Sequence, residues 1–144
     1  MVKNNFVKMN CKKNYSISFI DEKEQNYRLI LSTCKYDNSI QKFRSSLSNN
    51  EREIVKRFKI ISRQNEFIAG RMLTKNNVLL IREKLKPNKI NTISGVWGFP
   101  IFDTKEINKM WVSIAHSKEY AASLLSEVGT PPIGVAIEEI SPEN

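Results

Sequence analysis

The residues near the C-terminus that could do chemistry are a carboxylate and the two small side chains that precede it. In the sequence IGVAIEEI (133–140), extended backbone would place Gly134, Ala136 and Glu138 on one face. This face leaves space for a ligand beside a carboxylate, whereas the opposite face is apolar. We therefore predict a strand over 133–140 whose apolar face packs on the helices. A plain edge strand with a solvated glutamate is the simpler alternative.

Two basic side chains could contact a phosphate. His116 is the single histidine and directly follows a predicted strand in SIAHS (113–117), where no second histidine or cysteine pair completes a metal site. Arg71 follows Gly70 inside a predicted helix, and an interior glycine implies close approach by another backbone or a ligand. The simpler alternatives are a turn histidine and an exposed arginine beside a packing glycine.

Hydrophobic periodicity predicts an α+β scaffold for these residues. Alternating stretches predict strands at 15–20, 27–34, 111–115 and 120–125, and the stretch 35–47 is ambiguous. The simplest fold is a small antiparallel sheet packed against two helices. We predict a single domain over 1–144, with residues 1–14 flexible.

Two capped helices are predicted between these strands. Asn49 or Asn50 would cap the first, EREIVKRF, which places Ile54 and Phe58 on one face. The second would run from Ser62 to about residue 85, where Pro87 and Asn88 follow, with apolar residues at helical spacing.

The net charge of +8 is concentrated in the first part of the chain. Residues 1–90 hold 20 Lys and Arg against 8 Asp and Glu, and residues 91–144 hold 3 against 7. This basic part suits nucleic acid, an anionic cofactor or an acidic protein, although a solvated lysine-rich surface explains it equally well. Nucleic acid is disfavoured because no aromatic and basic RNA-binding signature is present.

The composition of the chain argues against a membrane-spanning or secreted protein and favours a cytoplasmic one. No apolar run approaches the roughly 20 residues of a membrane span. The basic N-terminal stretch contains no apolar h-region, so we expect no secretory signal there. Cys11 and Cys34 match no metal motif, and we expect two free thiols in a reducing cytoplasm, with a disulfide between them as the alternative.

Five segments in order resemble the N-terminal half of a surfactin-type 4′-phosphopantetheinyl transferase. That family shows an Arg-Phe-like pair, a Gly-Arg helix, a Gly-x-Pro turn, a Ser-His-Ser strand end and a Gly-(Ile/Val)-Asp-(Ile/Val)-Glu strand. The corresponding segments here are VKRF (55–58), FIAGR (67–71), WGFP (97–100), SIAHS (113–117) and IGVAIEEI (133–140). The match runs from about residue 48 to the C-terminus, and 15–20 fits the family's first strand.

The resemblance implies transfer of the phosphopantetheine arm of coenzyme A, with Mg²⁺, to a serine of an acyl or peptidyl carrier protein. This modification serves fatty acid, polyketide and nonribosomal peptide biosynthesis in the cytoplasm. By resemblance, His116 contacts the 3′-phosphate, Arg71 and Ser117 assist in cofactor binding, and Glu138 is a metal ligand. His116 and Glu138 should then line one cleft.

Departures from the family pattern predict that the chain is inactive by itself. Ala136 replaces the metal aspartate, Ala115 replaces the serine before the histidine, and Phe99 stands where many members have a basic residue. We expect no room after Glu138 for the family's Lys-Glu helix. Because the small trimeric synthases carry that helix in their own chains, we also expect the protein to differ from them. We therefore expect pairing with a second copy or a complementary C-terminal half. The alternative is a degenerate, non-catalytic relative that acts as a binding or interaction protein.

Overall fold

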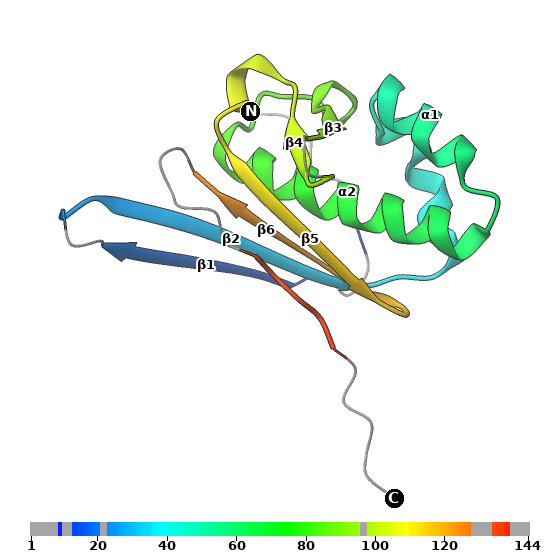
Figure 1. Ribbon diagram of the computed structural model, residues 1–144, viewed down its shortest axis with the longest axis horizontal. Coiled ribbons are helices and arrows are strands. Elements are labelled where there is room, and N and C mark those ends of the chain that lie inside the picture. Colours follow the sequence, from blue (N-terminus) through cyan, green and yellow to red (C-terminus); the bar gives the residue numbers. More distant parts are fainter. Residues whose placement is uncertain (1–8, 10–12, 21–22, 96–97, 128–133, 139–144) are drawn as a thin grey trace, which may run out of the picture.

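The computed structural model describes residues 9, 13–20, 23–95, 98–127 and 134–138. Within these ranges the chain forms a four-stranded antiparallel sheet, a two-stranded sheet and two α-helices (Figure 1). The large sheet has the strand order β1-β2-β6-β5. The elements are β1 (Lys13–Ile20), β2 (Asn26–Lys35), α1 (Asn49–Arg57), α2 (Ile61–Ile81), β3 (Thr92–Ser94), β4 (Pro100–Phe102), β5 (Trp111–Ser117) and β6 (Tyr120–Ser126). The predicted α+β class is confirmed.

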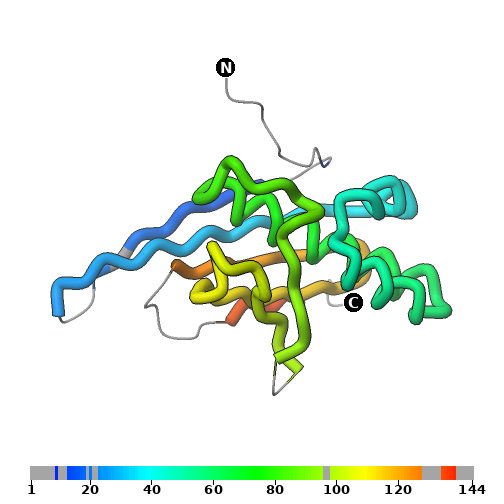
Figure 2. The backbone as a smooth tube through the Cα atoms, turned by 90° about the horizontal axis from the view of Figure 1, so that it is seen from above, coloured from blue at the N-terminus to red at the C-terminus, as the bar shows by residue number. Residues whose placement is uncertain are grey.

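The long helix α2 covers one face of the large sheet, as Figures 1 and 2 show from two directions. The strand register brings Ile30 of β2 opposite Leu125 of β6, and Cys34 opposite Ala121. All four side chains are buried on the α2 face. Because side chains alternate along a strand, the residues between them point to the open face.

Hydrogen bonds between side chains fix α2 on this face. Thr74 Oγ1 lies 2.7 Å from Ser123 Oγ, and Asn77 Nδ2 donates to the carbonyl of Ser123 at 3.0 Å. Asn77 Oδ1 also accepts from the hydroxyl of Ser32. These contacts satisfy buried polar groups that would otherwise oppose packing of the helix on the sheet.

The N-cap of the first helix lies one residue before Asn49, the first of the two predicted caps. Ser48 is the N-cap: its Oγ accepts from the backbone N–H of Glu51, and Glu51 Oε1 accepts from the N–H of Ser48. This reciprocal pair is a capping box, which the spacing Ser-x-x-Glu could have indicated. Val55, rather than Ile54, is fully buried. Because Ser48 is the N-cap, the predicted cap at Asn49 or Asn50 is wrong.

The second helix also differs from its prediction. It begins at Ile61 without a side-chain cap and ends at Ile81, so it stops before the predicted end near residue 85. The ambiguous stretch forms a 3₁₀ helix over Asn38–Ser46. No described helix is long and apolar enough to cross a membrane.

Two further predictions concern the flexibility of residues 1–14 and the state of the two cysteines. Lys13 and Asn14 of the predicted flexible stretch belong to β1. Cys34 is buried in the core, whereas Cys11 lies outside the described residues, so the expected state of the two thiols stays a prediction.

The C-terminal segment 134–138 lies along the open face of the large sheet (Figure 1). It is anchored where the N–H of Val135 donates to Ser113 Oγ at 3.1 Å. Its described residues form no ladder of strand hydrogen bonds, so the predicted strand is wrong over this range. The predicted alternation is nevertheless present: Val135 and Ile137 are half-buried, and Gly134, Ala136 and Glu138 are exposed. The apolar side chains meet the sheet and not the helices.

Candidate functional site

Two of the predicted site residues, Arg71 and His116, line the same cavity of about 230 Å³. Arg71 comes from α2 and His116 from β5, and the cavity lies on the face of the sheet that α2 covers. Its full lining is Phe58, Arg63, Glu66, Phe67, Arg71, Pro100, Ile114 and His116.

His116 points towards α2 because of its register in the sheet. It stands opposite Ala121, a buried residue of the α2 face. Its Nδ1 lies 3.6 Å from Glu66 Oε2, and 43% of its side chain is exposed. The strand predicted from the sequence ends directly before His116, but β5 is longer than predicted and has His116 as its penultimate residue.

Gly70 explains how α2 comes so close to β5. A β-carbon added to this glycine would stand 2.6 Å from Cγ2 of Ile114. The close approach predicted for this glycine is therefore made by a side chain of the neighbouring strand. It places the adjacent Arg71 beside the end of β5.

The guanidinium of Arg71 is held at the cavity with little hydrogen bonding. Its side chain is 16% exposed, and its Nε lies 3.9 Å from Glu51 Oε2. Its Cζ lies 4.3 Å from the ring centroid of Phe67, a cation–π contact. The buried Nε has no hydrogen-bond partner among the described residues. Burial lowers the pKa of Arg71 and the charge of Glu51 opposes this, so the group remains cationic at ordinary pH.

A buried ionic cluster behind the cavity was not predicted from the sequence. Glu51 is fully buried and its Oε1 lies 2.7 Å from Lys75 Nζ, while its Oε2 accepts from Thr92 Oγ1 at 2.6 Å. Lys75 Nζ also donates to the carbonyls of Pro87 and Ile90. Burial lowers the pKa of Lys75 below its ordinary value, and the charge and hydrogen bond of Glu51 offset only part of this shift. The capping-box spacing was the one available signal for Glu51.

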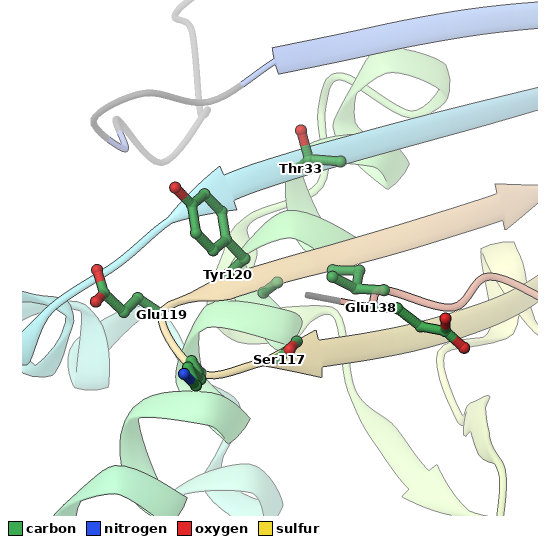
Figure 3. Close-up of a pocket in the computed structure, with 8 residues that line it drawn as sticks. Thr33, Ser117, Glu119, Tyr120 and Glu138 are labelled. Carbon is green, nitrogen blue, oxygen red and sulfur yellow. The ribbon is translucent and has the colours of Figure 1, made fainter. Parts of the chain in front are cut away.

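The other two predicted residues, Ser117 and Glu138, line a second cavity of about 450 Å³. Figure 3 shows Thr33, Ser117 and Tyr120 projecting from three neighbouring strands, with Glu138 on the C-terminal segment. This cavity lies on the open face of the sheet. Its full lining is Thr33, Ser117, Lys118, Glu119, Tyr120, Ala121, Ile137 and Glu138.

The expectation that His116 and Glu138 line one cleft is wrong for this chain. Successive residues of a strand point to opposite faces, so His116 faces α2 while Ser117 faces away. The segment that carries Glu138 lies on the open face. The predicted site is thus divided into a cationic cavity and a separate, mostly apolar one.

The residues around Glu138 do not fit a magnesium site by themselves. Mg²⁺ in proteins is held by one or two carboxylates together with substrate phosphates and water. Ala136 shares the exposed side of the segment with Glu138 but offers no oxygen ligand. Across the described ranges, no group of three or more His, Cys, Asp or Glu side chains could hold a metal ion.

Comparison with solved structures finds several chains of the same general shape, one of which is a holo-(acyl-carrier-protein) synthase. No family model matches the chain, and no curated protein matches it. A holo-(acyl-carrier-protein) synthase from Bacillus anthracis, solved in complex with CoA (3′,5′-ADP), matches with a TM-score of 0.57 and 26% sequence identity. The match covers 68% of this chain and 92% of the synthase chain.

This similarity supports the resemblance to phosphopantetheinyl transferases and does not distinguish the surfactin type. It does not support the expected difference from the small synthases, because nearly the whole synthase chain is matched. The protein is therefore similar in structure to a holo-(acyl-carrier-protein) synthase and has a fold of the phosphopantetheinyl transferase kind.

Proposed function

We propose that this chain is a subdomain of a surfactin-type 4′-phosphopantetheinyl transferase that binds coenzyme A in the cytoplasm. It contributes there to phosphopantetheine transfer onto a carrier-protein serine. The observation that supports this most is the cationic cavity with Arg71 and His116 side by side. Similarity to a synthase solved with a coenzyme A-derived nucleotide supports the same ligand.

The charges around this cavity suit a phosphate group. Arg63 and Arg71 outnumber the single carboxylate of Glu66 in its lining. The planar guanidinium of Arg71 has donors for phosphate oxygens, and its buried Nε makes no hydrogen bond to another described residue. The Nδ1 of His116 faces Glu66, which leaves Nε2 as the ring nitrogen for a ligand. The 3′-phosphate is the proposed occupant.

Ser117 and Glu138 remain proposed contacts for another part of the same ligand. Because they lie on the open face, a ligand that touches both cavities must pass around the outer edge of β5 or the turn between β5 and β6. A single carboxylate with Ala136 beside it is a weak metal site, so Mg²⁺ binding by the chain alone should be weak. We accordingly expect no turnover without a partner.

The open face of the sheet is the proposed surface for pairing. Tyr15, Ile17, Trp111 and Tyr120 lie on this face and are 45–50% exposed. Exposed apolar patches of this kind often mark protein interfaces. A second copy of the chain or a complementary C-terminal half would cover this face and bring the missing carboxylates near Glu138.

A non-catalytic role is the second candidate function. It is favoured by Ala136 and by the lack of a metal-binding cluster among the described residues. Such a relative would bind coenzyme A, a carrier protein or another protein without chemistry.

Titration calorimetry with coenzyme A tests the proposed ligand. We expect binding by the natural chain, a loss of roughly tenfold or more in Arg71→Ala, and a smaller loss in His116→Ala. Arg82→Ala is the matched control, since Arg82 is exposed at the end of α2. If the natural chain does not bind coenzyme A, the proposed function is wrong.

Mass spectrometry of an apo carrier protein separates the two candidate functions. A phosphopantetheine gain that requires both this chain and its partner supports the transferase role. Coenzyme A binding with no gain under any pairing supports the non-catalytic role. A gain with this chain alone contradicts the expectation of inactivity.

A further inference from the structure

The carboxylate of Glu51 lies directly behind the cationic cavity and cannot move independently of its surroundings. It is fully buried and receives hydrogen bonds from the backbone of Ser48 at 2.9 Å and from Thr92 Oγ1 at 2.6 Å. Its Oε1 is also 2.7 Å from Lys75 Nζ. Residues from three separate parts of the chain therefore fix the position of one negative charge.

The charges of this cluster are unequally distributed. Lys75 already neutralises Glu51 through a short contact and donates its remaining protons to backbone carbonyls. Arg71 stands farther away, with its Nε 3.9 Å from Glu51 Oε2, beyond hydrogen-bonding range. Two cations thus share one anion, and Arg71 keeps an excess positive charge at the cavity.

The 3.9 Å separation between Arg71 Nε and Glu51 Oε2 leaves the guanidinium of Arg71 available to a ligand. A tight bidentate pair with a carboxylate would occupy the guanidinium and compete with any external anion. Here Glu51 orients the Nε edge while the Phe67 ring, 4.3 Å from Cζ, supports one flat side. Among the described residues, the buried Nε itself has no hydrogen-bond partner.

We propose that Glu51 is a positioning residue for the anion site, because it fixes the guanidinium of Arg71 without neutralising it. The ligand-binding part of this inference rests on the proposed function. Its structural part, the restraint of Arg71 by Glu51, does not depend on which ligand is bound.

A double-mutant cycle tests how Glu51 acts. The probe is adenosine 3′,5′-bisphosphate, titrated into the natural chain, Glu51→Gln, Arg71→Ala and the double variant. We expect Glu51→Gln to bind about tenfold more weakly, and this loss to disappear in the Arg71→Ala background. The same loss in both backgrounds would show a general structural effect and would overturn the proposal. Glu53→Gln is the control, since Glu53 is exposed on the same helix and pairs with Lys56.

Thr92→Val provides a second variant that leaves every charge in place. It removes the hydroxyl that donates to the Oε2 nearest Arg71. We expect a smaller affinity loss that also depends on Arg71, so the proposal can be tested if Glu51→Gln does not fold. An affinity loss in Thr92→Val that persists without Arg71 would count against it.

Nuclear magnetic resonance of the arginine Nε–H group tests the restraint without any ligand. The Arg71 signal is identified by its loss in Arg71→Ala. We expect this Nε–H to be rigid in the natural chain and mobile in Glu51→Gln or Thr92→Val. Unchanged rigidity would overturn the proposal. Rigidity that depends on Glu51, in a chain that binds no bisphosphate, would instead contradict only the proposed function.

Discussion

Gly70 of α2 and Ile114 of β5 meet so closely that a β-carbon on the glycine would stand 2.6 Å from Cγ2 of the isoleucine. Ile114 also lines the cationic cavity, and Gly70 precedes Arg71. The contact therefore determines both the packing of the helix on the sheet and the position of the proposed ligand site.

Replacing this glycine should force the two elements apart. Because Ile114 is β-branched and stiff, we expect overpacking in Gly70→Ala to cost about 1–3 kcal/mol, partly offset by about 1 kcal/mol of helix propensity. Denaturant unfolding measures this change. The added substitution Ile114→Ala should cost less in Gly70→Ala than in the natural chain. A stabilised Gly70→Ala would show that the approach is looser than described.

Lys75 should contribute strongly to stability. Its ammonium compensates a fully buried carboxylate, and removing one partner of a buried pair typically costs about 3–5 kcal/mol. We expect Lys75→Met to lower the free energy of unfolding by roughly 3 kcal/mol. Lys56→Met, which breaks the exposed pair with Glu53, should change it by less than about 1 kcal/mol. Equal effects of the two substitutions would contradict the buried cluster.

Tyr36 should show an alkaline titration that depends on folding. Its hydroxyl donates to the carbonyl of Lys118 at 2.6 Å, in the turn after His116 and Ser117. Burial raises the pKa of Tyr36 to about 12, with smaller contributions from the charges of Glu66, Cys34 and Glu119.

The direction of this pKa shift determines the pH range over which Tyr36 contributes to the stability of the folded chain. A raised pKa favours the neutral phenol in the folded chain, so its contribution to stability is complete below pH 10, the ordinary value, and is lost as pH rises through 12. Tyrosinate absorbance, compared between the natural chain and Tyr36→Phe, measures the titration. A difference spectrum with its midpoint near 10 would contradict the described environment.

Ala136→Asp should create a metal site that the natural chain lacks. Residues 136 and 138 lie on the same exposed side of the C-terminal segment, so the new carboxylate would stand beside Glu138. We expect Mg²⁺ to strengthen coenzyme A binding roughly tenfold or more in this variant. Ala136→Asn, which has a similar shape without the charge, is the control. An identical Mg²⁺ response in both variants would remove Glu138 as a metal ligand.

Local patterns in the sequence predicted most of the fold. Alternation in the stretches 15–20, 27–34, 111–115 and 120–125 placed four strands within one or two residues of their ends. The helical spacing of Ile61, Ile68, Met72 and Leu79 identified most of the buried side of α2. The last three are fully or almost fully buried, whereas Ile61, the first residue of the helix, is 55% exposed. These features depend on near neighbours, which a sequence contains directly.

The candidate site was harder to predict because it depends on which face each side chain occupies. The family resemblance grouped His116 with Glu138, but the alternation of β5 and the course of segment 134–138 put them on opposite faces. Glu51 and Lys75 were missed because charged residues on helices are usually exposed. Only long-range contacts with Thr92 and the backbone of Ile90 explain their burial.

The most direct test of the central claim compares coenzyme A with its analogue that lacks the 3′-phosphate. The account predicts that the natural chain binds coenzyme A at least roughly tenfold more tightly than the analogue, and that Arg71→Ala loses most of this difference. Equal affinity of the natural chain for the two ligands would contradict the assignment of the Arg71 and His116 cavity to a phosphate.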